Sequence, residues 1–205
     1  MIAVLDYSMG NLLSVTKALE TAGAEVRIVD NPVDAAKFNA VILPGVGNFG
    51  EGMENLRSSG MDKVVLQHAA AGKPLLGICL GMQMMLQSSE EAPGVAGLGL
   101  FPGQVKRFPS GIDKVPLMGW NTLKINHMHP LVNGVKDDTY FYFVHSFYAS
   151  CDDENIIAKS EYIVEYASII GKNNVAGVQF HPEKSQSDGL HLLGNFVNYC
   201  KKFEI

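Results

Sequence analysis

The feature that most constrains this chain is a cysteine between two glycines, in the run G-I-C-L-G at residues 77–81. The apolar residues 75–78 are typical of a buried strand, and the apolar residues 80–86 predict a helix. The pattern is the cysteine form of the nucleophile elbow, a tight strand-to-helix turn whose flanking glycines allow unusual backbone angles and close packing. It favours Cys79 as a nucleophile, with its thiolate stabilised at a helix N-terminus, over a small buried cysteine with a structural role.

Strands and helices alternate in the N-terminal half of the chain. Apolar runs predict strands at 2–5, 25–29, 40–43 and 75–78. Between them, helices are predicted at about 11–22, 51–58 and 61–71, with a short helical turn opening at Asn31-Pro32. This alternation indicates βαβ units and a parallel sheet. Ligands bind beyond the carboxyl ends of such strands, so the glycine loop at 44–47 and Cys79 are expected at the same edge.

Beyond Ser88 the predicted strands become short and are separated by Gly and Pro. They are expected at 104–108, 115–117, 122–125, 140–148, 156–159, 164–170 and 175–179. Asp188 is expected to cap a last helix at 189–202. We therefore predict an α/β fold with an open, largely parallel twisted sheet flanked by helices. An additional short mixed or antiparallel sheet is expected in the C-terminal half, within a single domain of residues 1–205.

Composition narrows the class of function. The chain has 205 residues, of which 47% are hydrophobic and 18% charged, and its net charge is −5 without a basic block. This argues against nucleic-acid binding and against an electrostatic membrane anchor. The three cysteines have long spacings and no C-x-x-C, which argues against a disulfide framework or a cysteine-rich zinc site and favours a reducing cytoplasm. The first residues are predicted to form a strand, not a signal peptide, and no apolar run reaches membrane-spanning length.

A cysteine nucleophile needs a base, and the base needs a group that orients it. Of six histidines, His181 stands out because it follows an apolar strand in the run Q-F-H-P-E at 179–183. Pro182 biases His181 toward extended backbone, in which Glu183 would point to the same side. The alternative is a strand-end histidine beside a solvated glutamate. In α/β-hydrolases the acid precedes the histidine, so the order found here argues against that fold.

Together, three motifs make the chain resemble the class I, or triad, glutamine amidotransferases. They are P-G-V-G at 44–47, G-I-C-L-G-M-Q at 77–83 and G-V-Q-F-H-P-E at 177–183. Within that class the chain is most similar to the glutaminase subunits of imidazole glycerol phosphate synthase. The runs that carry this finer resemblance are D-Y-S-M-G-N-L at 6–12, P-G-V-G-N-F at 44–49, P-L-M-G-W-N at 116–121, Y-F-V-H-S-F at 142–147 and H-P-E-K-S at 181–185. Val46 replaces the second proline of the P-G-P-G loop of anthranilate and aminodeoxychorismate relatives, and the G-G-E-S loop of the pyridoxal-phosphate relative is absent.

The resemblance implies a role for each matching residue. Cys79 would attack the side-chain amide of L-glutamine, His181 would move the proton, and Glu183 would orient His181, through a γ-glutamyl thioester. The oxyanion would be bound by the N–H of Leu80 and by the 44–47 loop, most directly by Val46 after a peptide flip. The residues implied in oxyanion and substrate binding are Gly45, Val46, Gly47, Leu80, Gln83, His145, Ser146 and Phe147. For Gln83, a helix-surface amide remains the alternative.

The resemblance also implies a partner. Ammonia would pass to a (βα)₈-barrel cyclase subunit in a heterodimer, for the synthesis of imidazole glycerol phosphate and aminoimidazole carboxamide ribotide in histidine biosynthesis. Trp120, Asn121, Tyr142 and Lys184 would face that subunit near the ammonia entrance, although Trp120 and Tyr142 are also consistent with core positions. No metal site is expected. No P-loop or dinucleotide fingerprint is present, so no nucleotide cofactor is expected either.

Three other functions remain open from the sequence. The chain is also consistent with an amidotransferase that serves a different synthase, with a silent relative that acts as a regulatory subunit, and with a cysteine hydrolase or redox sensor on a similar sheet. Residues Cys79, His181 and Glu183 are all present, which argues against the silent relative.

Overall fold

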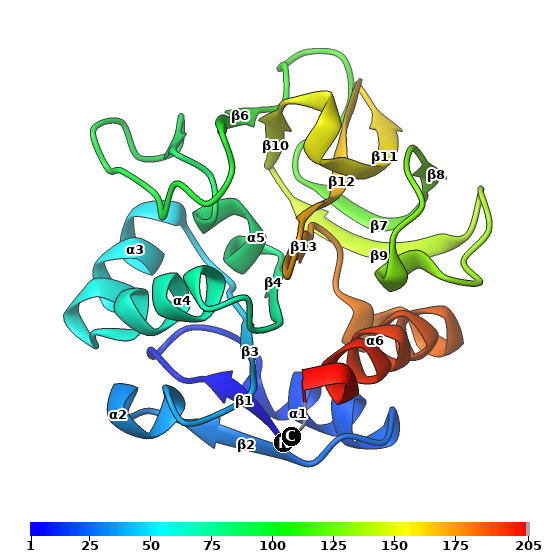
Figure 1. Cartoon of the computed structure of the whole chain (residues 1–205). Coiled ribbons are helices and arrows are strands. Elements are labelled where there is room, and N and C mark those ends of the chain that lie inside the picture. Colours follow the sequence, from blue (N-terminus) through cyan, green and yellow to red (C-terminus); the bar gives the residue numbers. More distant parts are fainter. Residues whose placement is uncertain (204–205) are drawn as a thin grey trace.

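The computed structural model describes residues 1–203 and has helices on both faces of a long twisted sheet (Figure 1). The α-helices are α1 (Leu12–Thr21), α2 (Pro32–Ala35), α3 (Phe49–Ser58), α4 (Met61–Ala70), α5 (Leu80–Met84) and α6 (Gln186–Cys200). Four short 3₁₀ helices are η1 (Pro130–Val132), η2 (Asp153–Asn155), η3 (Pro182–Lys184) and η4 (Lys201–Phe203). The strands are β1 (Ile2–Leu5), β2 (Val26–Val29), β3 (Ala40–Leu43), β4 (Leu75–Ile78), β5 (Ser88–Ser89), β6 (Gly103–Arg107), β7 (Leu117–Thr122), β8 (Lys124–Ile125), β9 (Tyr140–His145), β10 (Phe147–Cys151), β11 (Ile156–Tyr162), β12 (Val164–Lys172) and β13 (Val175–Val178).

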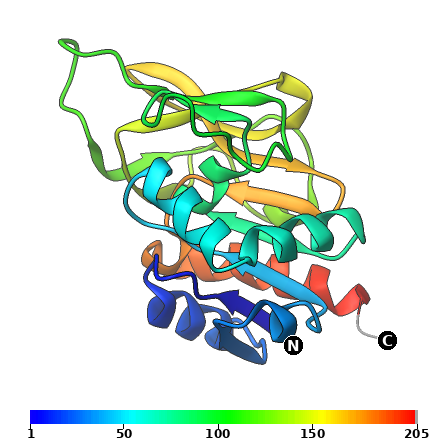
Figure 2. The ribbon, with the colours of Figure 1, turned by 90° about the vertical axis from the view of Figure 1, so that its left-hand side faces the viewer.

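The main sheet joins a parallel half to an antiparallel half. Its order is β2-β1-β3-β4-β13-β12-β10-β6-β5, with β11 and β8 branching from β12. Neighbours from β2 to β13 are parallel, whereas β12 is antiparallel to both β13 and β10. In Figure 2 the N-terminal strands β1 and β2 lie at one end of the molecule and β10 to β12 at the other, with β13 between them. The predicted α/β class with a largely parallel sheet is confirmed.

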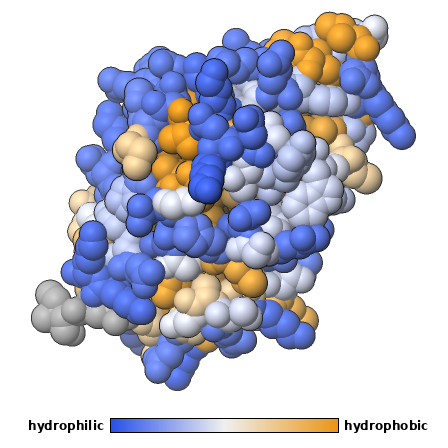
Figure 3. Space-filling view, turned by 90° about the vertical axis from the view of Figure 1, so that its right-hand side faces the viewer, coloured by the Kyte–Doolittle hydropathy of each residue, from blue (hydrophilic) through white to orange (hydrophobic). Residues whose placement is uncertain are grey.

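Two hydrophobic cores lie on opposite faces of the sheet because alternate strand residues point to opposite sides. In β1, Ile2 and Val4 pack under α1 and α6, while Ala3 and Leu5 pack under α3, α4 and α5. The helices of the two groups are on opposite sides of the sheet in Figure 1. Seen from the side of β9 and α6, the outer surface is mostly hydrophilic, with separate hydrophobic patches (Figure 3). Among the described residues, no helix is both long and apolar enough to cross a membrane.

The C-terminal half differs in detail from the sequence-based expectation. Most of its strands extend the main sheet, and within residues 1–203 only β7 and β9 form a separate antiparallel pair. The strand predicted at 140–148 is two strands, β9 and β10, which belong to different sheets. The prediction of a strand at 115–117 is wrong, since β7 begins at Leu117.

Helix ends also differ from the predictions. Helix α6 begins three residues early, with Ser185 at its N-cap, so Asp188 lies in the first turn and is not the cap. Helix α5 ends at Met84, two residues before the predicted end. Asn11 and Asn31 cap α1 and α2, because each side chain accepts a backbone N–H of the first turn.

The sheet order explains why distant segments meet. Strands β3, β4 and β13 are adjacent and parallel, with Leu43 paired to Gly77 and Ile78 paired to Val178. The segments that follow these three strands therefore leave the same edge of the sheet. They are the loop at 44–48, the turn at Cys79 and the run at 179–181.

Candidate active site

The turn at Cys79 is strained in the way that a nucleophile elbow requires. Cys79 has φ 54° and ψ −109°, a combination that residues other than glycine rarely adopt. It lies between the end of β4 and the start of α5. A Cβ on Gly81 would lie 1.9 Å from the carbonyl oxygen of Leu43, and one on Gly77 would lie 2.8 Å from the backbone of Gly81. Both glycines are therefore required by close backbone packing, and the turn holds Cys79 in a single position.

His181 and Glu183 lie close together, as predicted, although by a different local structure. His181 Nδ1 is 2.8 Å from Glu183 Oε1, and both side chains are almost fully buried. The predicted extended backbone holds for His181 only, because Glu183 lies in η3 and is turned back toward the imidazole. Since the carboxylate accepts, Nδ1 carries the proton of this bond and Nε2 is the free ring nitrogen. The His181 backbone N–H donates to the Tyr142 carbonyl at 2.9 Å, which fixes the start of this turn.

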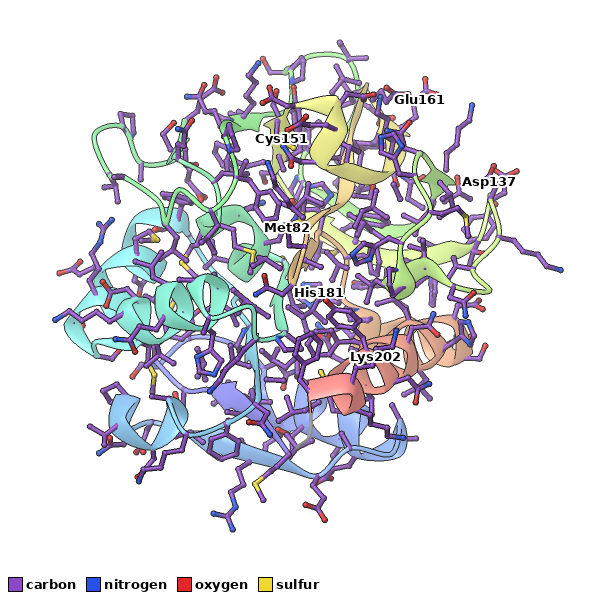
Figure 4. The ribbon with its side chains drawn as sticks, in the orientation of Figure 1. Met82, Asp137, Cys151, Glu161, His181 and Lys202 are labelled. Carbon is purple, nitrogen blue, oxygen red and sulfur yellow. The ribbon has the colours of Figure 1, made fainter. Side chains whose placement is uncertain are left out.

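The charges around His181 favour its protonated form. Burial disfavours the charged ring, but interactions with Cys79 and Glu183 outweigh it and raise the pKa of His181 to about 10. His181 lies near the centre of the molecule, where β4, β13 and α5 meet (Figure 4). An imidazolium beside a thiol is the arrangement that makes a cysteine nucleophilic at neutral pH.

Cys151 has no comparable setting. It is the last residue of β10 and lies away from His181 (Figure 4). Burial, with smaller contributions from the nearby Asp152 and Asp153, raises the pKa of its thiol to about 11. Cys151 is thus held as a neutral thiol, which agrees with the absence of a glycine elbow around it.

A cavity of about 310 Å³ opens over Cys79, of a size typical of small-molecule sites. Its walls include most of the predicted oxyanion and substrate residues, namely Val46, Gly47, Leu80, Gln83, His145, Ser146 and Phe147. Gly45 is not part of the lining: it packs beneath the loop, where a Cβ would lie 2.8 Å from Tyr7 Oη and 2.9 Å from Leu80 Cβ. In this geometry Gly45 therefore supports the loop from beneath and does not face the substrate cavity.

Two predicted side chains are already hydrogen-bonded within the protein. Gln83 Nε2 donates to the Phe147 carbonyl at 2.9 Å and to Gln179 Oε1 at 3.0 Å. His145 Nδ1 is 2.8 Å from the same carbonyl, so it is the protonated nitrogen, and its buried Nε2 has no partner among the described residues. Burial, together with the nearby His181, lowers the pKa of His145 to about 4 despite that hydrogen bond. His145 is thus neutral at physiological pH.

Sequence reasoning missed several residues of this site. Glu91 is the only carboxylate in the cavity lining, and its Oε2 accepts the Phe49 N–H at 2.8 Å. It lies in an irregular segment with no motif to mark it. Tyr7 donates from its hydroxyl to the Pro44 carbonyl, and burial, with a smaller contribution from Cys79, raises the pKa of Tyr7 far above its usual value. Tyr7 thus anchors the start of the glycine loop from the end of β1.

The residues expected at a partner surface lie on β7, β9 and η3. Trp120 is 45% exposed, and its ring meets that of Tyr142 edge-on, with the centroids 6.1 Å apart. Lys184 Nζ lies 5.9 Å from the centre of the Tyr142 ring. Asn121 instead donates to the Glu161 carbonyl at 3.0 Å, so its side chain faces β11. Trp120 is therefore a surface residue, and a core position is excluded for it.

The exposed aromatic surface is larger than predicted. Met118 and Tyr140 are exposed, and each lies two residues before Trp120 or Tyr142 in the same strand, so it points to the same side. We call the set Met118, Trp120, Tyr140 and Tyr142 the β7–β9 outer face. An apolar surface of this kind commonly marks an interface.

Comparisons with known proteins agree with the fold and site. The family model described as glutamine amidotransferase class-I matches residues 3–199. The imidazole glycerol phosphate synthase subunit HisH of Natronomonas pharaonis is 49% identical, over 97% of this chain and 94% of its own. The HisH subunit of Methanosarcina mazei is 47% identical, over 97% of this chain and 98% of its own. The structure of PurLQS from Thermotoga maritima has a TM-score of 0.77 at 22% identity, covering 97% of each chain, which shows a shared fold.

Proposed function

The chain belongs to the class-I glutamine amidotransferase family, with HisH subunits of imidazole glycerol phosphate synthase among its relatives, and on that premise we propose how its residues hydrolyse L-glutamine. The products are glutamate and ammonia, and residues 1–205 act as one amidotransferase domain. The observation that carries the proposal is the buried group of Cys79, His181 and Glu183, of which Cys79 and His181 line the cavity.

The first step is attack by the Cys79 thiolate on the side-chain amide carbon of glutamine. A tetrahedral intermediate forms, with its negative charge on the former carbonyl oxygen. Leu80 is the first residue of α5, so its N–H has no partner within the helix and can bind that oxygen. Val46, which also lines the cavity, supplies the second N–H after its peptide turns toward the oxyanion.

His181 manages the protons of the reaction. As an imidazolium, it donates a proton from Nε2 to the departing nitrogen, which leaves as ammonia while the thioester to Cys79 forms. The neutral ring then takes a proton from water, whose oxygen attacks the thioester and releases glutamate. Glu183 keeps the proton on Nδ1 throughout and balances the charge of the imidazolium, a role supported by the 2.8 Å contact.

The walls of the cavity supply groups for the α-amino and α-carboxylate ends of glutamine. Glu91 brings a negative charge that suits the α-ammonium group. The backbone at 145–147 also lines the cavity and suits the carboxylate. Both hydrogens on Gln83 Nε2 are already bonded, so Gln83 contacts glutamine through its Oε1.

The β7–β9 outer face, with Lys184, is where we place the cyclase partner. Trp120 and Tyr142 supply aromatic anchors of the kind that dominate interface energies. The backbone N–H of His181 donates to the carbonyl of Tyr142, so the β7–β9 outer face is linked to the site by a direct hydrogen bond. The partner is a (βα)₈-barrel cyclase that uses the ammonia to form imidazole glycerol phosphate and aminoimidazole carboxamide ribotide.

The test is glutamate release from glutamine, with and without a barrel cyclase subunit and its nucleotide ligand. We expect strong stimulation by the partner, and none in Cys79→Ala, which should still bind the partner because its backbone is unchanged. Full activity without the partner would instead indicate a free-standing hydrolase. No stimulation by this cyclase would contradict the proposed partner.

A further inference from the structure

Gln179 lies beside the nucleophile but has no role in the mechanism above. It directly follows β13, and the Cys79 N–H donates to the carbonyl of the preceding Val178 at 2.8 Å. Gln179 in turn donates its backbone N–H to the Ser168 carbonyl at 2.9 Å. The side chain is fully buried, at 0% exposure, so its amide must be hydrogen-bonded within the protein.

The hydrogen bonds define which way the Gln179 amide points. The Phe147 carbonyl can only accept, so the nitrogen of Gln83 faces it, at 2.9 Å. The second hydrogen on that nitrogen reaches Gln179 Oε1 at 3.0 Å. Gln179 Nε2 therefore faces the other way, toward Cys79 Sγ at 3.9 Å. A flipped Gln179 would set two NH₂ groups against each other and an oxygen against the sulfur.

We propose that Gln179 is a positioning residue that donates an N–H to Cys79 Sγ and stabilises its thiolate. The inference rests on the proposed function in taking Cys79 as the nucleophile. Cys79 is only 7% exposed, and a buried anion that loses a hydrogen-bond donor is disfavoured. Gln83 links this donor to the cavity wall, because it holds the oxygen of Gln179 while bonding to Phe147.

The rate at which iodoacetamide alkylates Cys79, followed by peptide mass spectrometry, depends on the thiolate form of Cys79. The measurement needs neither glutamine nor a partner. Gln179→Met removes the donor and keeps an unbranched side chain. We expect it to slow alkylation about tenfold at pH 7, the effect of losing one hydrogen bond to a charged group. The difference should shrink at pH 9, where more of the thiol ionises in both proteins. Gln179→Glu should be slower still at pH 7, because a carboxylate then faces the sulfur.

Ser168→Ala is the matched control. Ser168 is also fully buried and pairs with Gln179 through its backbone, but its hydroxyl bonds to Ser160 at 2.5 Å. It should alkylate like the wild type. The proposal is overturned if Gln179→Met and wild type alkylate equally at both pH values, or if Ser168→Ala is slowed as much. If Gln179→Met does not fold, the test uses Gln179→Glu, whose side chain has nearly the same shape. Alkylation of Gln179→Glu at the wild-type rate would then overturn the proposal.

Glutamate release by the wild type with the cyclase separates this proposal from the proposed function. If that activity is absent while alkylation follows the predicted order, glutamine hydrolysis is contradicted and the role of Gln179 is supported. If activity is present while the Gln179 variants alkylate at the wild-type rate, only the proposed role of Gln179 is contradicted.

Discussion

Gly81 is the residue with the least room in the site. A Cβ there would lie 1.9 Å from the carbonyl oxygen of Leu43, the last residue of β3. That oxygen is held in place because β3 is paired with β4. We expect Gly81→Ala to lower the free energy of unfolding by about 3 kcal/mol or more, the scale of severe overpacking. Urea unfolding measures this.

Gly194 provides the control for that substitution. It lies within α6, and a Cβ there would meet no atom within 4 Å. Gly194→Ala should raise the free energy of unfolding by about 0.5–1 kcal/mol, through helix propensity alone. Equal effects of the two substitutions would show that the elbow is not tightly packed.

His145 predicts a pH dependence of stability. Its pKa falls from 6.5 to about 4 on folding, so the unfolded chain binds more protons between these values. Stability is therefore full above pH 6.5 and decreases as the pH falls toward 4, by about 3 kcal/mol for a shift of this size. We expect His145→Gln to weaken the dependence of urea-unfolding free energy on pH between 7 and 5. Substitution of the exposed His127 should leave it unchanged, and an unchanged slope in His145→Gln would refute the assignment.

At the level of the strands, the β7–β9 outer face predicts where the partner binds. Trp120→Ala should weaken cyclase binding by about 2 kcal/mol, or roughly 30-fold in Kd, because it removes a central aromatic anchor. Titration calorimetry or surface plasmon resonance measures the change. Met128→Ala is the control, since Met128 is exposed but lies beside Tyr199 of α6. Equal affinities for wild type and Trp120→Ala would place the interface elsewhere.

The elements differ in how well the sequence predicts them. The strands β3 and β4 are apolar runs of four residues that follow Asn39 and Pro74, so their positions follow from local signals. The continuous run at 140–148 gives no sign that β9 and β10 join different sheets, because that change is fixed by pairing with β7 on one side and with β6 and β12 on the other. Long-range pairing has no local signature.

At the scale of the whole molecule, adjacent parallel strands bring the glycine loop, Cys79 and His181 to one edge. This convergence follows from βαβ topology, so the sequence predicts it together with the motif residues. Glu91, Tyr7 and Gln179 were not predicted, because their positions depend on the packing of an irregular segment and on side-chain hydrogen bonds between distant strands.

The most direct test of the account is to detect the γ-glutamyl group of glutamine covalently bound to Cys79. The wild-type chain, with its cyclase subunit, would be mixed with isotopically labelled glutamine, quenched in acid during turnover and analysed by peptide mass spectrometry. The account predicts a labelled γ-glutamyl thioester on Cys79, and none on Cys151 or Cys200. Release of labelled glutamate by Cys79→Ala at the wild-type rate would contradict it.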